Sequence, residues 1–136
     1  KVFRGDKKTE LSHFLVDAYT NTTPKFSKRK SKSIVEKINL SSVVVLICMK
    51  RDEKESVPEW EEIAATAMAV QNLWLKTTEL GLGGYWSTPA YIKQIHQFTT
   101  LEENEKCLGL FYLGGFEGPM PNREPGDWRK KVQWFG

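Results

Sequence analysis

The sequence predicts a layered α/β or α+β domain in which helices cover a hydrophobic sheet. Two observations predict the sheet: the runs 42–49 and 107–113 are apolar almost throughout, which is typical of strands covered on both faces. A third observation predicts the helical layers, because helical stretches alternate with these strands along the chain. With 136 residues and 40% hydrophobic content, the chain is long enough for one domain with a real core.

The first third of the chain predicts a short strand and two helices. Residues 1–3 read as the end of a strand, and Gly5-Asp6 as a turn. Thr9 is then placed to cap a helix whose apolar residues share one face: Leu11, Phe14, Leu15 and Ala18. The basic segment 25–32 follows and leads into a short helix through Ile34 and Ile38.

The basic segment 25–32 has two interpretations: a phosphate or nucleic-acid patch, or a solvated loop. The net charge of +3 is too small to argue for nucleic acid, and only Phe26 interleaves an aromatic ring with the cations. We therefore favour the solvated loop and predict no nucleic-acid partner.

The segment 58–80 predicts one long helix after a charged loop. Ser56 and Glu59 fit a capping box, and the helix would be about 35 Å long at ~1.5 Å per residue. Apolar residues form two adjacent stripes, so we expect a central, largely buried helix. One small domain cannot easily bury that length, which favours a partner subunit.

A glycine-rich turn and a short aromatic strand follow this helix. Gly81 is a C-terminal stop, Gly83-Gly84 lead into Tyr85-Trp86-Ser87, and Thr88-Pro89 open another short helix. Glycines here can expose backbone groups to a closely approaching ligand, or they can serve an ordinary helix-to-strand connection. Composition alone favours the ordinary connection.

Most self-contained chemistry is absent from the sequence. His13 and His96 have no second ligand at metal spacing, and no nucleophile, phosphate-loop or dinucleotide motif is present. Cys48 and Cys107 lie in the predicted strands, so we expect buried, reduced thiols and a cytoplasmic location. No signal peptide or apolar run of membrane-spanning length is present, so we predict no membrane partner.

Three stretches together resemble the nitroreductase family of flavoproteins, and within it the short bacterial NAD(P)H nitroreductases. They are VPEWEEIAATAMAVQNLWLKTTELGLGGYW, CLGLFYLGG and the REP of the tail. The resemblance implies an α+β nitroreductase-like fold with a central antiparallel sheet wrapped by helices. It also implies an intertwined homodimer with FMN at its interface, in which the helix 58–80 is the long central dimer helix.

The same resemblance implies the site residues. Gly84, Tyr85, Trp86 and Ser87 would lie along the FMN ring, and Arg123 would reach the phosphate, a role that Arg129 could take instead. The end of the long helix would contact NAD(P)H through Leu75, Lys76, Thr77, Thr78, Glu79 and Leu80. No side chain is expected to be catalytic, because the flavin supplies the chemistry.

The implied function is an FMN-dependent oxidoreductase that transfers hydride from NAD(P)H to nitro compounds, quinones or similar small acceptors by a ping-pong mechanism. Family members begin with a helix and an arginine-arginine-serine segment, and neither precedes Lys1. The resemblance therefore implies a single domain over residues 1–136 that lacks this N-terminal part. The alternative is a truncated, flavin-free family member that acts as a structural or interaction module.

Overall fold

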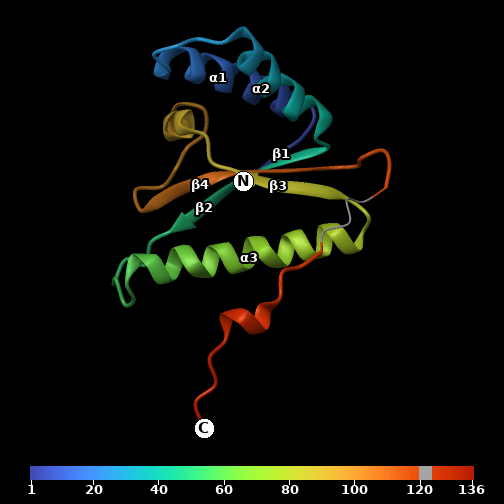
Figure 1. Ribbon diagram of the computed structural model, residues 1–136. Helices are drawn as coiled ribbons and strands as arrows, with labels where there is room; N and C mark the ends of the chain where they lie inside the picture. The colour runs from blue at the N-terminus through green and yellow to red at the C-terminus, as the bar shows by residue number, and fades with distance from the viewer. Residues whose placement is uncertain (120–123) are drawn as a thin grey trace.

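A four-stranded sheet with helices on both faces forms the body of the molecule (Figure 1). The computed structural model describes residues 1–119 and 124–136. The strands are β1 (Val2–Phe3), β2 (Val43–Lys50), β3 (Gly83–Ser87) and β4 (Glu105–Gly114). The helices are α1 (Asp6–Thr22), α2 (Lys28–Leu40) and α3 (Glu59–Glu79), with the 3-10 helices η1 (Ala90–Gln97) and η2 (Trp128–Lys131).

The sheet is antiparallel throughout and has the strand order β1-β2-β4-β3. The long strands β2 and β4 occupy its centre, while the short strands β1 and β3 form its edges. The β2–β4 register shifts between Ile47 and Cys48, so Leu108 lies in a bulge of β4. The predicted α+β fold with a central antiparallel sheet wrapped by helices is confirmed.

One face of the sheet is covered by α1, α2 and η1 (Figure 1). These helices and the facing sides of β2 and β4 contribute the larger hydrophobic core: Leu11, Leu15, Ala18, Tyr19, Ile34, Ile38, Val44, Leu46, Tyr91, Ile92, Ile95, Leu110 and Tyr112. The apolar spacing read from the sequence therefore placed Leu11, Leu15 and Ala18 correctly.

Of the described elements, α3 covers the other face (Figure 1). Among the residues that the structure describes, the buried members of its hydrophobic core are Ile47, Val70 and Phe111. The expectation that the long helix is largely buried is wrong for the single chain: Val70 and Thr77 are its only buried residues. Met68 and Leu75 are 63% and 60% exposed, because the sheet is too narrow to cover both apolar stripes.

The helix starts differ from the predicted caps. The first helix begins at Asp6, after Gly5 with a φ of 55°, and not at Thr9. Ser56 forms no capping box, because its hydroxyl donates to Asp52 Oδ2 at 2.6 Å and Pro58 is the N-cap of α3. Loop contacts therefore replace the helix caps that the sequence suggested.

The described C-terminal segment 124–136 leaves the body of the molecule beyond α3, on the side away from the sheet (Figure 1). All of its residues are exposed, including Trp128, Trp134 and Phe135. Among the described helices, none has both the length and the apolar character needed to cross a membrane.

Candidate functional site

The glycine turn between α3 and β3 is a left-handed helix ending. Gly81 has a φ of 71°, and its N–H donates to the Thr78 carbonyl at 3.0 Å. The N–H of Leu82 donates to the Thr77 carbonyl at 3.0 Å, which completes the closure. A residue with a side chain is strained at this φ, so the turn requires glycine at 81 and sends the chain directly into the edge strand β3.

A groove of about 290 Å³ lies where this edge strand meets the end of α2. It is lined by Lys37, Leu40, Ser41, Gly83, Gly84, Tyr85, Tyr112, Leu113, Gly114, Gly115 and Phe116. The Tyr85 and Tyr112 rings stack with centroids 5.0 Å apart, and Lys37 Nζ is 5.8 Å from the Tyr85 centroid. The groove thus combines an aromatic floor, a cation and exposed backbone.

Tyr112 is the buried half of this aromatic pair. Burial, together with the nearby Tyr91 and Tyr85, raises the pKa of its phenol above the ordinary value. The ring therefore stays neutral across the physiological range and adds no negative charge beside a bound ligand.

Gly84 and Tyr85 both line the groove, which unites two of the four residues predicted to contact FMN. They lie on an edge strand, and in an antiparallel sheet every second residue of such a strand directs its N–H and C=O away from its neighbour. Backbone donors and acceptors are therefore available along β3 for a planar ligand.

Trp86 faces the opposite side of the sheet. Its side chain packs against the smaller core, and its indole N–H donates to the Leu108 carbonyl at 3.1 Å. The Thr88 hydroxyl donates to the same carbonyl at 3.2 Å, which is why Thr88 does not cap η1. The Trp86 ring thus anchors β3 to the bulge of β4, while only its backbone remains on the sheet edge.

The need for glycine at position 84 comes from the core. A Cβ atom at Gly84 would lie 2.8 Å from two ring carbons of Phe111 and 3.1 Å from the Tyr112 carbonyl. Close packing of β3 on β4 therefore accounts for this glycine without any ligand. Ser87, the fourth predicted residue, pairs with Leu110 at the far end of the strand.

The residues predicted to contact NAD(P)H form the last turn of α3. Leu75 and Leu80 are exposed, and Lys76 pairs with Glu79 at 3.0 Å. The hydroxyls of Thr77 and Thr78 donate to the carbonyls four residues earlier, at 2.8 and 3.0 Å. The polar side chains of Lys76, Thr77, Thr78 and Glu79 thus have their partners within the helix. The exposed side chains of Leu75 and Leu80 are available to contact a ligand or partner.

The predicted phosphate ligand Arg123 lies outside the described residues. Its alternative, Arg129, stacks on Trp128 with 5.1 Å between the guanidinium carbon and the ring centroid, and Nη1 lies 3.7 Å from Asp127. In Figure 1 this segment lies beyond α3, so the structure does not bring Arg129 to the groove. Lys37 is the groove's cation, and its position was not apparent from the sequence.

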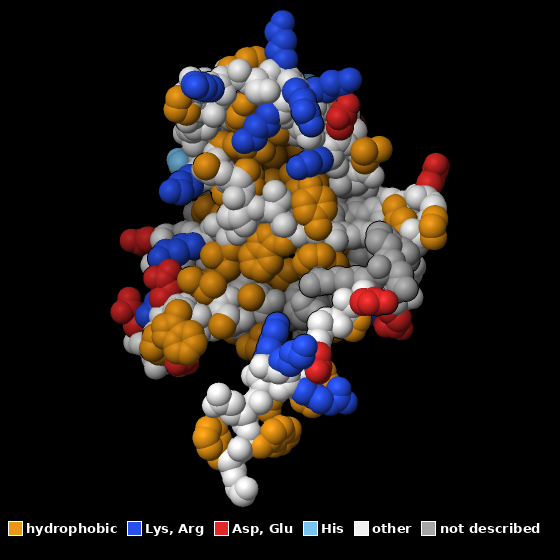
Figure 2. Space-filling view, in the orientation of Figure 1, with side chains coloured by type: hydrophobic (Ala, Val, Ile, Leu, Met, Phe, Trp, Pro, Cys, Tyr) orange, Lys and Arg blue, Asp and Glu red, His pale blue; other side chains and the backbone are white. Residues whose placement is uncertain are grey.

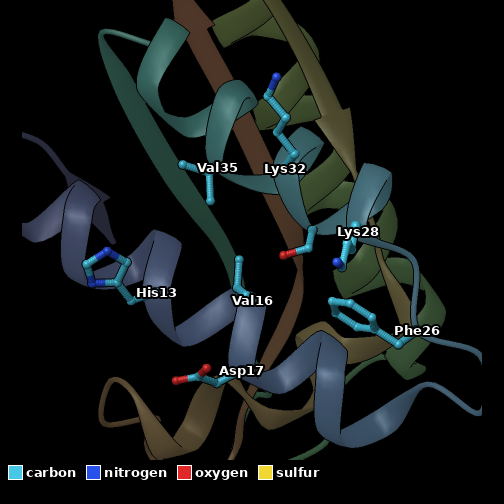
Figure 3. Close-up of a pocket in the computed structure, with 8 residues that line it drawn as sticks. His13, Val16, Asp17, Phe26, Lys28, Lys32 and Val35 are labelled. Atoms are coloured by element: carbon cyan, nitrogen blue, oxygen red, sulfur yellow. The ribbon is translucent and has the colours of Figure 1, made fainter.

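A second pocket, of about 590 Å³, opens between α1 and α2 (Figure 3). His13 and Asp17 project from α1, and Lys28 and Lys32 from α2, around the apolar side chains of Val16, Phe26 and Val35. Lys32 pairs with Glu36 at 3.5 Å, and Lys30 lies 5.1 Å from the Tyr19 ring centroid. One cation of the basic segment is therefore ion-paired and another lies over an aromatic ring. No described group of three His, Cys, Asp or Glu could hold a metal.

The Nitroreductase family model matches residues 2–115. A curated relative, "Putative NAD(P)H nitroreductase YfhC" of Bacillus subtilis (strain 168), is 31% identical over an alignment of 104 residues. The match covers 69% of this chain and 53% of the relative. The chain therefore belongs to the Nitroreductase family, and it spans about half the length of that relative.

Solved structures share the fold. A nitroreductase-like family protein from Bacillus cereus superposes with a TM-score of 0.74 at 18% identity, over 99% of this chain and 71% of that one. Oxidized iodotyrosine deiodinase, in a structure bound to FMN and 3-iodo-L-tyrosine, gives 0.64 at 15% identity over 93% and 71%. A BluB-like flavoprotein from Clostridium difficile 630 gives 0.62 at 14% identity over 100% and 78%.

Proposed function

We propose that this chain is an FMN-dependent oxidoreductase acting on small molecules, with NAD(P)H as co-substrate. Membership in the Nitroreductase family over residues 2–115 is the observation that carries the proposal. When bound, FMN would take a hydride from NAD(P)H and pass it to a nitro compound, quinone or similar acceptor in a ping-pong cycle. The FMN in the deiodinase structure supports a flavin site on this fold.

The groove beside β3 fits one wall of such a site. The backbone of Gly84 and Tyr85 offers hydrogen bonds along a strand edge, and the Tyr85 ring offers a flat apolar surface. Lys37 supplies a positive charge at the same groove. These groups bind and orient a planar, anionic cofactor, and none has to act as a nucleophile.

Trp86 and Ser87 act through the strand in this proposal. The indole anchor on the Leu108 carbonyl fixes β3 against β4, so the backbone at 84–87 keeps one position relative to the groove. Arg123 remains the proposed phosphate ligand. The last turn of α3, residues 75–80, remains the proposed NAD(P)H contact.

We further propose that the functional unit is a homodimer formed through α3. Large apolar side chains are exposed along this helix: Trp60, Ile63, Met68, Trp74 and Leu75. Figure 2 shows hydrophobic side chains at the level of the sheet and α3, while many of the Lys and Arg side chains in view lie over the α1–α2 layer. A second copy would remove this apolar surface from water. We place the enzyme in the cytoplasm, where the unpaired thiols of Cys48 and Cys107 persist.

Flavin titration tests the proposed function. The purified chain should bind FMN, seen as quenching of flavin fluorescence, and should then oxidise NAD(P)H when a quinone is added. Lys37→Ala should raise the Kd for FMN about two- to fivefold, which corresponds to the loss of roughly 0.4–1 kcal/mol expected for one exposed charge contact. Lys32→Ala is the matched control, because Lys32 is an exposed lysine of the same helix that pairs with Glu36.

Two outcomes contradict the proposal. A protein that stays colourless at high FMN concentration, while its circular dichroism shows it folded, would favour the flavin-free structural or interaction module. Equal Kd values for Lys37→Ala, Lys32→Ala and the wild type would mean that the flavin binds outside this groove. They would contradict the proposed site but not the proposed activity.

A further inference from the structure

Cys48 and Cys107 are direct cross-strand partners in the centre of the sheet. Cys48 lies on β2 and Cys107 on β4, and the antiparallel register places them opposite each other. Both side chains pack on the face covered by α1, α2 and η1, so the two sulfurs point to the same side. Both are free and half-buried, which corrects the expectation of fully buried thiols.

This placement satisfies the main distance requirement of a disulfide. Directly opposed residues of antiparallel strands have Cα atoms about 4.5–5.5 Å apart, inside the range of about 4.4–6.8 Å that disulfides need. The bulge at Leu108 adjoins Cys107, and a bulge interrupts the regular ladder. Because the ladder is interrupted beside Cys107, the two Cβ atoms can shift towards the separation that a disulfide needs more easily than they could in a regular ladder.

The two thiols are chemically unequal. The neighbouring Cys48 thiol lowers the pKa of Cys107, and the backbone of Gly109 assists. The same thiol pair, together with burial and the nearby Glu105 carboxylate, raises the pKa of Cys48. Cys107 is therefore the better nucleophile and Cys48 the thiol that follows.

A metal is a poor alternative occupant for this pair. No group of three His, Cys, Asp or Glu within residues 1–119 and 124–136 is arranged to hold a metal ion. The nearest carboxylate, Glu105, is engaged by the Lys1 ammonium group. Two thiols with no third ligand favour sulfur–sulfur chemistry.

We propose that Cys48 and Cys107 are a redox site that closes reversibly into a disulfide across β2 and β4, with a small-molecule disulfide such as oxidised glutathione as oxidant. The Cys107 thiolate attacks one sulfur of the oxidant, forms a mixed disulfide and releases one small thiolate. Cys48 then attacks the Cys107 sulfur, loses its proton and expels the second small thiol. Two protein thiols are oxidised by two electrons, and one small disulfide is reduced to two thiols.

The test follows the intact mass of the chain after incubation with oxidised glutathione. The wild type should lose two hydrogens, a fall of about 2 Da, and carry no glutathione, since the second step expels it. Dithiothreitol should restore the original mass. Trypsin digestion without reductant should yield the peptides 38–50 and 107–123 joined to each other, which identifies the bond in the unmodified sequence.

Single variants separate the two steps. Cys48→Ser should stop at a stable glutathione adduct on Cys107, while Cys107→Ser should form an adduct on Cys48 much more slowly. The peptide map of the wild type does not depend on whether either variant folds. A wild type that keeps both thiols alkylatable, accumulates the adduct or forms only disulfide-linked dimers would overturn the proposal.

Discussion

The two faces of the sheet differ in how completely the chain covers them. On the face under α1, α2 and η1, side chains such as Leu11, Leu15 and Ile38 have no exposed surface. On the face under α3, the hydrophobic cluster has three buried members, and most of the helix's large apolar side chains remain in contact with water. The difference shows that the chain buries one face of its sheet well and leaves a large apolar surface exposed on the helix that covers the other.

The comparison also explains how α3 holds its place despite the small core beneath it. Arg51 reaches from the preceding loop to Glu62 at 2.6 Å, and the turn after α3 is closed by backbone bonds from Gly81 and Leu82. Polar contacts at its two ends therefore position the helix, while the large apolar side chains between them stay exposed.

The largest predicted effect contrasts one leucine from each layer. Leu15→Ala should lower the free energy of unfolding by about 2–5 kcal/mol, because it removes a fully buried side chain and leaves a cavity. Leu75→Ala, at a position 60% exposed, should change the unfolding of the isolated chain by less than about 0.5 kcal/mol. In sedimentation, however, Leu75→Ala should shift the dimer towards monomer, and Leu15→Ala should not do so at temperatures where it is folded.

Urea unfolding at two protein concentrations separates these effects. A dimer that buries the α3 face has a midpoint that rises with protein concentration, and Leu75→Ala should weaken that dependence. A wild type that sediments as a stable monomer, with a midpoint independent of concentration, would break the contrast. Such a result would mean that the apolar face of α3 stays in contact with water in the native protein.

Much of the fold could be predicted from the sequence, because its signals are local. The predicted strand 42–49 was observed as β2 and the predicted strand 107–113 lies within β4, while the helix 58–80 was observed within one residue at each end. The α3 environment could not be predicted in the same way. Two apolar stripes indicate how much of the helix surface is apolar, but not whether the same chain or a partner covers it.

The candidate site likewise contains residues that could be predicted from the sequence and residues that could not. Residues 85–87 were predicted as a short strand after a glycine turn, and β3 begins two residues earlier, at Gly83. The family resemblance, and not the strand pattern, assigned Gly84 and Tyr85 to one site. Lys37 and Tyr112 could not, because they reach the groove only through the packing of α2 and β4 around it. Trp86 shows the limit most clearly: period-2 alternation puts it opposite Tyr85, but the Leu108 carbonyl that holds its indole belongs to a bulge with no sequence signal.

Gly109→Ala is predicted to have an intermediate effect on the free energy of unfolding. It tests how tightly β3 packs against β4. Gly109 has a φ of 139°, and a Cβ there would lie 2.5 Å from Trp86 Nε1 and 2.6 Å from the Ser87 carbonyl. We expect a loss of about 1–3 kcal/mol in unfolding free energy, from backbone strain and overpacking.

The matched control for Gly109→Ala is Gly115→Ala, where a Cβ would meet nothing within 4 Å. That variant should unfold within about 0.5 kcal/mol of the wild type. Chemical denaturation monitored by tryptophan fluorescence measures both variants. Equal midpoints would mean that β3 is loosely attached, and that the indole anchor does not fix the groove.

The smallest predicted effect concerns the ionic contact that positions the start of α3. Glu62 and Arg51 side chains are only 13% and 15% exposed, and the Asp52 N–H also donates to Glu62 Oε1 at 2.8 Å. The hydrogen bond from Arg51 lowers the pKa of Glu62, so the stabilisation is present above the unfolded pKa of about 4.5 and is lost as the pH falls through the lower folded value. Glu62→Gln should therefore lower the urea midpoint at pH 7, by less than Gly109→Ala does, and should approach the wild type below pH 4.

Glu61→Gln, at an exposed position with no ion pair within the described residues, should match the wild type at both pH values. If Glu62→Gln instead kept its deficit in acid, the contact would act through shape and not charge, and α3 would be held by packing after all.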